Sequence, residues 1–219
     1  MSGPPVFGIT GWKNSGKTTL TERLVGELTA RGLRIATIKH AHHHFDIDHE
    51  GTDSYRHRAA GAREVAIVSG RRWALTHELD GEEEPRMEDI LARLSPADLV
   101  LIEGYKAESH PKIEARRLEN KSREPLSARD PNILAIAADH EIADSPLPVF
   151  AIDDITAIAD FILPSLNIER PRASRASSRL FRTQPRPPAP RRGPGPASPP
   201  PPPHHRHRRG GAAARAPQW

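Results

Sequence analysis

Short apolar runs alternate along residues 1–169 with segments in which apolar residues recur at helical spacing. The runs predict strands at 6–10, 34–39, 65–68, 72–76, 98–103, 112–116, 133–137 and 149–152. The helical spacing predicts helices from Thr18 to about Gly32, at 55–62, after Pro85, and from a cap at Asp153 to Phe161. Strands that alternate with helices, several of them apolar throughout, are typical of a parallel sheet. The pattern therefore predicts an α/β fold with a mostly parallel sheet flanked by helices and a β-hairpin insertion.

Residues 11–18, Gly-Trp-Lys-Asn-Ser-Gly-Lys-Thr, lie between the first predicted strand and the first predicted helix. They match the P-loop pattern G-x-x-x-x-G-K-[ST] in the setting that this pattern requires. Gly11 and Gly16 allow the backbone to approach a phosphate closely, and a helix N-terminus favours an anion. We expect Lys17 to reach the β- and γ-phosphates and the Thr18 hydroxyl to bind Mg²⁺. The motif predicts a nucleotide site.

A magnesium site in such a protein also needs a carboxylate at the end of a neighbouring strand. Glu103 is the first candidate, because four apolar residues precede it and Gly104 would let a γ-phosphate approach; its alternative is an ordinary solvated strand end. Asp53 is the second candidate, with a helix cap as the alternative. Asp139 follows the apolar run 133–138 and fits a strand-end position for reading guanine, although the usual Asn-Lys or Thr-Lys lead-in is absent.

Five histidines and two aspartates crowd the segment 40–49. Imidazole suits zinc, nickel and copper, so this loop is a candidate for a transition-metal site or for contacts to an anionic ligand, with a polar surface loop as the alternative. Lys39 and His40 are predicted to stand at a strand tip beside the P-loop. A second anion site could be made by Arg56, Arg58 and Arg63 with Lys106 and Lys112, and the alternative for each of them is solvated surface charge.

The composition changes near Arg170. Residues 170–219 hold 13 of the 23 prolines and 12 of the 32 lysines and arginines, and no acidic residue, which leaves 20 basic and 28 acidic residues in 1–169. This composition predicts a disordered Pro/Arg/His-rich tail at 170–219 behind a single P-loop nucleotide-binding domain at 1–169. The arginines could bind an acidic surface or nucleic acid, but no aromatic residues interleave with them as base stacking prefers, so nucleic-acid binding is not our expectation.

The sequence contains no cysteine, which excludes a disulfide framework and a thiolate metal site. No apolar run approaches the length of a membrane span, and the N-terminus lacks the pattern of a signal peptide. We therefore expect a cytoplasmic protein that does not enter the membrane.

Several segments, taken together and in order, resemble one family. They are residues 11–19, the Ile-Lys-His-Ala-His-His segment 38–43, residues 53–56 and 60–62, residues 72–75, the Ile-Glu-Gly-Tyr-Lys segment 102–106, residues 111–113 and residues 135–139. In this arrangement the chain, from residue 6 to about 164, is similar to the MobB family of molybdopterin-guanine dinucleotide biosynthesis adaptor proteins.

The resemblance implies a homodimeric P-loop GTPase that binds GTP and Mg²⁺ and associates with MobA, the guanylyltransferase that joins GMP to molybdopterin. It places the P-loop residues on the phosphates: Gly11, Asn14, Ser15, Gly16, Lys17, Thr18 and Thr19. It makes Thr18 and Glu103 the metal-side groups, with Lys17 and Glu103 as the catalytic pair. Asp139 would read the base. Lys39, His40 and Asp53 would lie near the γ-phosphate or the pterin, and Asp53 stays the second candidate for the metal. The resemblance does not extend to the tail from Arg170.

Two other functions fit the same residues. A GTP-dependent metal-delivery chaperone would load zinc or nickel on the histidine loop, through His42 and His43. A small-molecule kinase would use the same P-loop to transfer the γ-phosphate. No glutamine or arginine finger is evident in the sequence, so we expect GTP hydrolysis to be weak or dependent on a partner.

Overall fold

The computed structural model describes residues 3–41, 45–120 and 123–169. The predicted tail at 170–219 and the histidines His42, His43 and His44 lie outside the described residues. The division of the chain at residue 169 and the metal role of these histidines therefore stay predictions.

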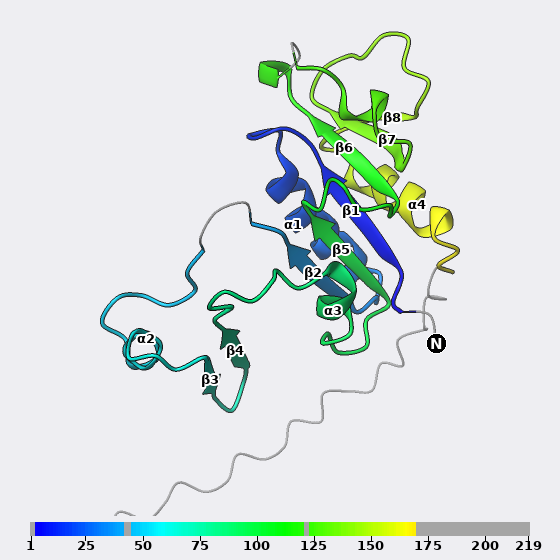
Figure 1. Cartoon of the computed structure of the whole chain (residues 1–219). Helices are drawn as coiled ribbons and strands as arrows, with labels where there is room; N and C mark the ends of the chain where they lie inside the picture. Colours follow the sequence, from blue (N-terminus) through cyan, green and yellow to red (C-terminus); the bar gives the residue numbers. More distant parts are fainter. Residues whose placement is uncertain (1–2, 42–44, 121–122, 170–219) are drawn as a thin grey trace, which may run out of the picture. The chain divides into compact units, whose positions relative to one another are not determined.

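Six parallel strands form the main sheet, in the order β2-β5-β1-β6-β7-β8 (Figure 1). Their bounds are β1 Val6–Thr10, β2 Ile35–Lys39, β5 Leu99–Glu103, β6 Lys112–Arg116, β7 Ile133–Ala138 and β8 Val149–Ala151. Every neighbouring pair is parallel. Because the carboxyl ends of parallel strands share one edge, the loops after β1, β2, β5, β6 and β7 open on the same side of the sheet.

Helices cover both faces of this sheet, which explains why β5 is apolar from Leu99 to Ile102. Helices α1 (Lys17–Ala30) and α4 (Ile155–Ser165) pack on one face, in a core that includes Phe7, Leu24 and Ile158. Helix α3 (Met87–Leu91) packs on the other face, where Met87 meets Ile102. Strand β5, which lies between β2 and β1 and is buried from Leu99 to Ile102, contributes to both cores. The predicted α/β class is confirmed.

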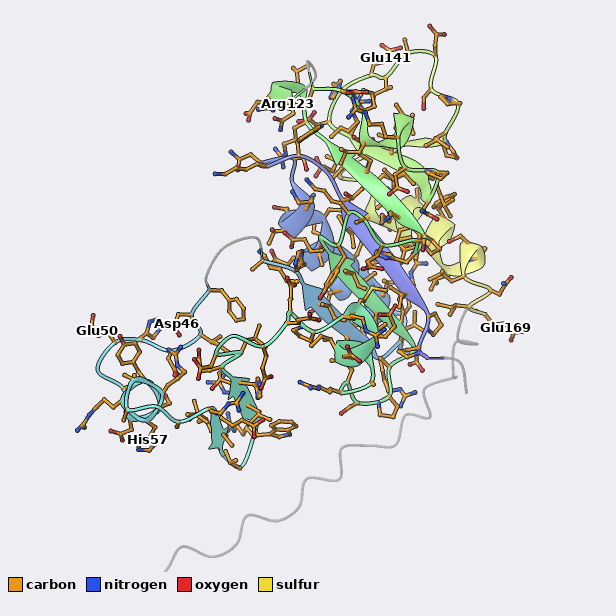
Figure 2. The ribbon with its side chains drawn as sticks, in the orientation of Figure 1. Asp46, Glu50, His57, Arg123, Glu141 and Glu169 are labelled. Atoms are coloured by element: carbon orange, nitrogen blue, oxygen red, sulfur yellow. The ribbon has the colours of Figure 1, made fainter. Side chains whose placement is uncertain are left out.

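The predicted hairpin is also present. Strands β3 (Glu64–Val68) and β4 (Trp73–His77) pair antiparallel as a two-stranded sheet of their own. The short helix α2 (Asp53–Ala59) precedes them. Arg58 of α2 reaches Asp46, at 2.7 Å, and Glu78, at 3.0 Å, so its guanidinium links this helix to the segments on either side. Figure 2 shows Asp46 on the segment that leads to α2, where His57 is also labelled.

The start of helix α4 differs from the prediction by one residue. The cap of α4 is Asp154, whose side chain accepts a hydrogen bond from the Ala157 amide at 3.1 Å, and the helix runs to Ser165 rather than to Phe161. Asp153, the predicted cap, instead pairs with Arg23 of α1. Two adjacent aspartates are equally good caps by sequence, and the contact to α1 decides between them. The short 3₁₀ turns Leu118–Asn120 and Leu126–Ala128 complete the described structure.

Within the described ranges, no helix has both the length and the apolar character to cross a bilayer.

Candidate nucleotide site at the carboxyl edge of the sheet

The P-loop joins β1 to α1 in a backbone conformation that ordinary residues resist. Gly11 has φ +150°, Asn14 φ +64° and Gly16 φ +88°. A β-carbon at position 11 would lie 2.5 Å from the Ala115 carbonyl oxygen of β6, so only glycine fits against that strand. The loop then leads directly into the first turn of α1, whose free amides face the same point.

The P-loop residues line a depression of about 330 Å³. The side chains and backbone around it belong to Asn14, Ser15, Gly16, Lys17, Thr18, Thr19, Arg117 and Glu119. The hydroxyl oxygen of Ser15 is buried without a hydrogen-bond partner among the described residues. An unsatisfied buried hydroxyl within the P-loop is a polar group that a bound ligand could satisfy.

Glu103 meets Thr18 and Lys39 at the end of β5. The Thr18 hydroxyl donates a hydrogen bond to Glu103 Oε1 at 2.9 Å, and Lys39 Nζ lies 3.6 Å from the same oxygen. The strand register produces this contact, because Glu103 is opposite Lys39 on β2 and opposite Ile9 on β1, which leads into the P-loop. The Glu103 carboxylate is 12% exposed.

This donor set fits magnesium. A hydroxyl and a carboxylate are hard oxygen ligands, and Mg²⁺ takes one or two such groups and fills its remaining positions with water and phosphate oxygens. Thr18 and Glu103 would hold the ion, which would neutralise charge on the β- and γ-phosphates when bound.

Lys17 is half-buried at the centre of the site. Its ammonium donates to the Trp12 carbonyl oxygen at 2.7 Å, within the P-loop itself. Burial lowers the pKa of Lys17, the Glu103 carboxylate acts in the opposite direction, and the charges of Lys106 and Lys39 lower this pKa further. Three ammonium groups near one carboxylate form a positive site suited to a polyphosphate.

Gly104 and His40 pack closely behind Glu103. A β-carbon at position 104 would lie 2.9 Å from His40 Cβ, and Gly104 has φ +105°. The His40 ring lies 4.4 Å from the Tyr105 ring centroid, and its Nε2 is 2.8 Å from Glu84 Oε1. The tip of β5 is therefore in direct contact with the tip of β2.

Asp139, at the end of β7, is bound to its own surroundings. Its Oδ1 accepts hydrogen bonds from the Leu118 amide at 2.7 Å and from His140 Nδ1 at 3.0 Å. Burial alone would raise the pKa of Asp139, but these hydrogen bonds, with the charges of His140 and Arg117, bring it below its usual range. The side chain is thus an ionised acceptor that lies next to the loop lining the depression.

Comparison with known proteins identifies the family. The model of the family "MobB: Molybdopterin guanine dinucleotide synthesis protein B" matches residues 6–139, which is more than half of the chain. The chain belongs to the MobB family.

Proteins of the MobB family resemble this chain in sequence and in structure. The molybdopterin-guanine dinucleotide biosynthesis adapter protein of Haemophilus influenzae is 41% identical over 161 residues, which cover 72% of this chain and 87% of that protein. The Escherichia coli adapter protein is 37% identical over 73% of this chain and 91% of its own. The crystal structure of Bacillus subtilis MobB superposes with a TM-score of 0.60 at 30% identity, covering 74% of this chain and 98% of that one.

Asp53 is predicted to bind the metal together with Glu103. The contact that the structure gives its carboxylate is with Arg56 and not with Glu103. Asp53 lies in the first turn of α2, where its carboxylate is 91% exposed and 3.8 Å from Arg56. The cap of α2 is its neighbour Thr52, whose hydroxyl accepts from the Tyr55 amide. The metal role of Asp53 stays a prediction. Across the described ranges, no three histidine, aspartate or glutamate residues come together as metal ligands.

Lys112 contradicts the expectation of an anion-binding surface lysine. Its side chain is fully buried, and its ammonium donates to Asp130 Oδ2 at 2.7 Å and to the Glu108 and Lys106 carbonyl oxygens. The position is buried because β6 lies between β1 and β7 in the middle of the sheet. Lys106 by contrast is exposed and places its ammonium 5.3 Å from the Trp12 ring centroid.

Sequence reasoning missed three residues beside the P-loop. Arg117 and Glu119 line the depression from the loop after β6. Arg123, labelled in Figure 2, lies with its guanidinium 5.5 Å from the Trp12 ring centroid. The pair Arg116-Arg117 at the end of a strand was the available signal, but its use depends on knowing that β6 is next to β1.

Proposed function

We propose that this chain binds GTP with Mg²⁺ at its P-loop and acts as an adapter in the biosynthesis of molybdopterin-guanine dinucleotide, where it assists MobA in joining GMP to molybdopterin. The family supports the pathway, since the relatives from Haemophilus influenzae and Escherichia coli bear the name of adapter proteins in that biosynthesis. The P-loop and its surroundings support the ligand.

The observation that carries the nucleotide proposal is the hydrogen bond between Thr18 and Glu103. These residues are 85 positions apart, and the fold brings a hydroxyl and a carboxylate to 2.9 Å at the mouth of a phosphate-binding loop. Lys17 and Lys39 place positive charge around the same carboxylate. A polyphosphate with a hard divalent cation is the ligand that satisfies both the basic groups and the oxygen ligands.

The packing of Gly104 on His40 supports a response to the nucleotide state. A γ-phosphate that contacts the Gly104 backbone would press on His40, because the two residues have no free space between them. His40 in turn contacts Tyr105 and Glu84. We infer that the triphosphate form holds these three side chains in a different arrangement from the diphosphate form, and that MobA distinguishes the two.

Hydrolysis of GTP by the chain alone is expected to be slow, with MobA or a second copy supplying a missing group.

Exposed apolar side chains on the hairpin support a self-associated form. Ile67, Val68, Trp73 and Leu75 are between 46% and 75% exposed on β3 and β4. A two-stranded sheet is marginally stable unless its apolar side chains are covered, and a second copy of the same hairpin would cover them.

Reconstitution with purified MobA tests the adapter role. Formation of molybdopterin-guanine dinucleotide from molybdopterin, GTP and MobA is followed with the full chain present or absent. The chain should raise the yield, and a folded Lys17→Ala variant, which lacks the ammonium expected to contact the phosphates, should not. Thr29→Ala, at a helix position away from the P-loop, serves as the matched control. Equal yields with the wild-type chain and with no chain would reject the adapter role.

A further inference from the structure

Arg117 lies against the P-loop from the side of β6. A β-carbon at Gly16 would be 2.9 Å from Arg117 Nε and 3.3 Å from its Nη2, so the guanidinium covers that glycine. Arg117 is half-buried and lines the same depression as Asn14 to Thr19. If the phosphates of a ligand occupied the P-loop, this guanidinium would lie beside the ligand.

Contacts on both sides fix the segment that carries Arg117. The Leu118 amide donates to Asp139 Oδ1 at 2.7 Å, and Asn120 Nδ2 donates to the Lys13 carbonyl oxygen at 3.2 Å. Among the residues that the structure describes, no hydrogen bond or ion pair engages the Arg117 guanidinium itself. Its backbone is held in place while its donors and its planar face stay available.

The order of the strands indicates which half of a bound nucleotide would lie near Arg117. Glu103 and Lys39, the groups suited to magnesium and the terminal phosphate, stand on β5 and β2, to one side of β1. Arg117 and Asp139 follow β6 and β7, on the other side of β1. With the terminal phosphate toward β5, the nucleoside half extends toward β6 and β7.

We propose that Arg117 stacks its guanidinium on the purine ring of the bound nucleotide and so holds the base beside Asp139. The proposal rests on the nucleotide binding proposed above and names a residue for it. A planar, weakly hydrated guanidinium stacks on aromatic rings in a way that an ammonium does not. The Asn-Lys pair that usually precedes a guanine-reading aspartate is missing here, because alanines occupy positions 137 and 138. The Arg117 guanidinium would take the place of the missing long side chain beside Asp139.

Calorimetric titration of the full chain in Mg²⁺ tests the assignment with three probes: GTP, GDP and inorganic tripolyphosphate. Arg117→Ala should weaken GTP and GDP about tenfold each, since stacking does not depend on the number of phosphates. Tripolyphosphate, which has no base, should bind as it does to the wild type. Arg117→Lys keeps the charge but not the plane, and should recover less than half of the lost free energy of binding.

Arg116→Ala is the matched control, because Arg116 is the preceding basic residue and does not line the depression. It should bind all three probes normally. A loss of tripolyphosphate binding in Arg117→Ala as large as the loss of GTP binding would overturn the stacking role and make Arg117 a phosphate ligand. Weaker GTP with unchanged GDP would overturn it in favour of a γ-phosphate contact.

The same titrations separate this inference from the proposed function. Normal GTP affinity in Arg117→Ala, beside lost affinity in Lys17→Ala, would refute the role of Arg117 and leave nucleotide binding intact. If the wild-type chain bound neither GTP nor GDP, both proposals would fall together.

Discussion

Lys39 and Glu103 are opposite each other on the parallel strands β2 and β5, and their side chains meet with Nζ 3.6 Å from Oε1. The same oxygen accepts the Thr18 hydroxyl from the start of α1. One carboxylate therefore joins groups from three elements at the carboxyl edge of the sheet. Replacing the Glu103 carboxylate therefore tests the prediction that this group binds magnesium.

Replacing the carboxylate should remove the benefit of magnesium. We expect Glu103→Gln to bind GTP about tenfold more weakly than the wild type in Mg²⁺, because the amide is a poorer ligand for a hard cation. In EDTA the two proteins should bind GTP alike. Glu141→Gln, an exposed substitution at the position labelled in Figure 2, is the control for the loss of one negative charge. A magnesium dependence equal to that of the wild type would exclude Glu103 from the metal site.

Two glycine substitutions should have opposite effects on stability. Gly104→Ala forces a β-carbon to 2.9 Å from His40 at φ +105°, and should destabilise the fold by about 1–3 kcal/mol. Gly26→Ala, within α1 with nothing inside 4 Å of the new carbon, should stabilise it by roughly 0.5–1 kcal/mol. Urea denaturation measures both. A neutral Gly104→Ala would mean that β5 and β2 are not packed tip to tip as described.

Replacing Lys112, for which no nucleotide contact is proposed, should lower the free energy of unfolding by a large amount. Lys112→Met leaves the partly buried Asp130 carboxylate and two carbonyl oxygens without their ammonium, at a cost of roughly 3 kcal/mol. Double replacement with Asp130→Asn should recover part of this loss. Denaturant unfolding of the two variants checks the prediction, and additive losses in the double variant would show that the ion pair is not coupled.

His110 should make stability depend on pH. Burial, followed by the charge of Lys112, lowers the pKa of His110 to about 4, and neither ring nitrogen has a hydrogen-bond partner within the described part of the chain. The folded-state pKa is below the unfolded value near 6.5, so the unfolded chain binds more protons between these values. Stability should therefore fall as pH falls through the window from about 6.5 to about 4, by up to about 3 kcal/mol.

Replacement of the histidine tests that window. His110→Leu should flatten the change in free energy of unfolding between pH 6.5 and pH 4, whereas His57→Leu, on the exposed surface of α2, should leave it as it is. An unchanged slope in His110→Leu would assign the acid sensitivity to other groups.

Local patterns predicted the fold well and the assembled site only in part. The strand at 6–10 and the P-loop could be predicted because eight adjacent residues define the motif. Glu103 could be predicted because a polar residue after a buried strand marks the carboxyl edge. The cap of α4 was displaced by one residue because two aspartates are adjacent there, and the contact between Asp153 and Arg23 of α1 decided the outcome.

The remaining errors have one physical cause, which is that sequence alone does not give the order of strands in a sheet. Lys112 was expected on the surface, but β6 lies centrally and buries it. Arg117 was overlooked because its place beside Gly16 depends on the pairing of β6 with β1. Neither fact is contained in the spacing of residues within either segment.

The central claim is that the P-loop of this chain holds the polyphosphate of GTP, and equilibrium titration calorimetry in Mg²⁺ tests it most directly. We predict saturable heat with a stoichiometry of one GTP per chain for the wild type, and a loss of affinity of about a hundredfold or more in a folded Lys17→Ala variant. The absence of binding heat with the wild-type chain at any temperature, or unchanged affinity in Lys17→Ala, would contradict the account.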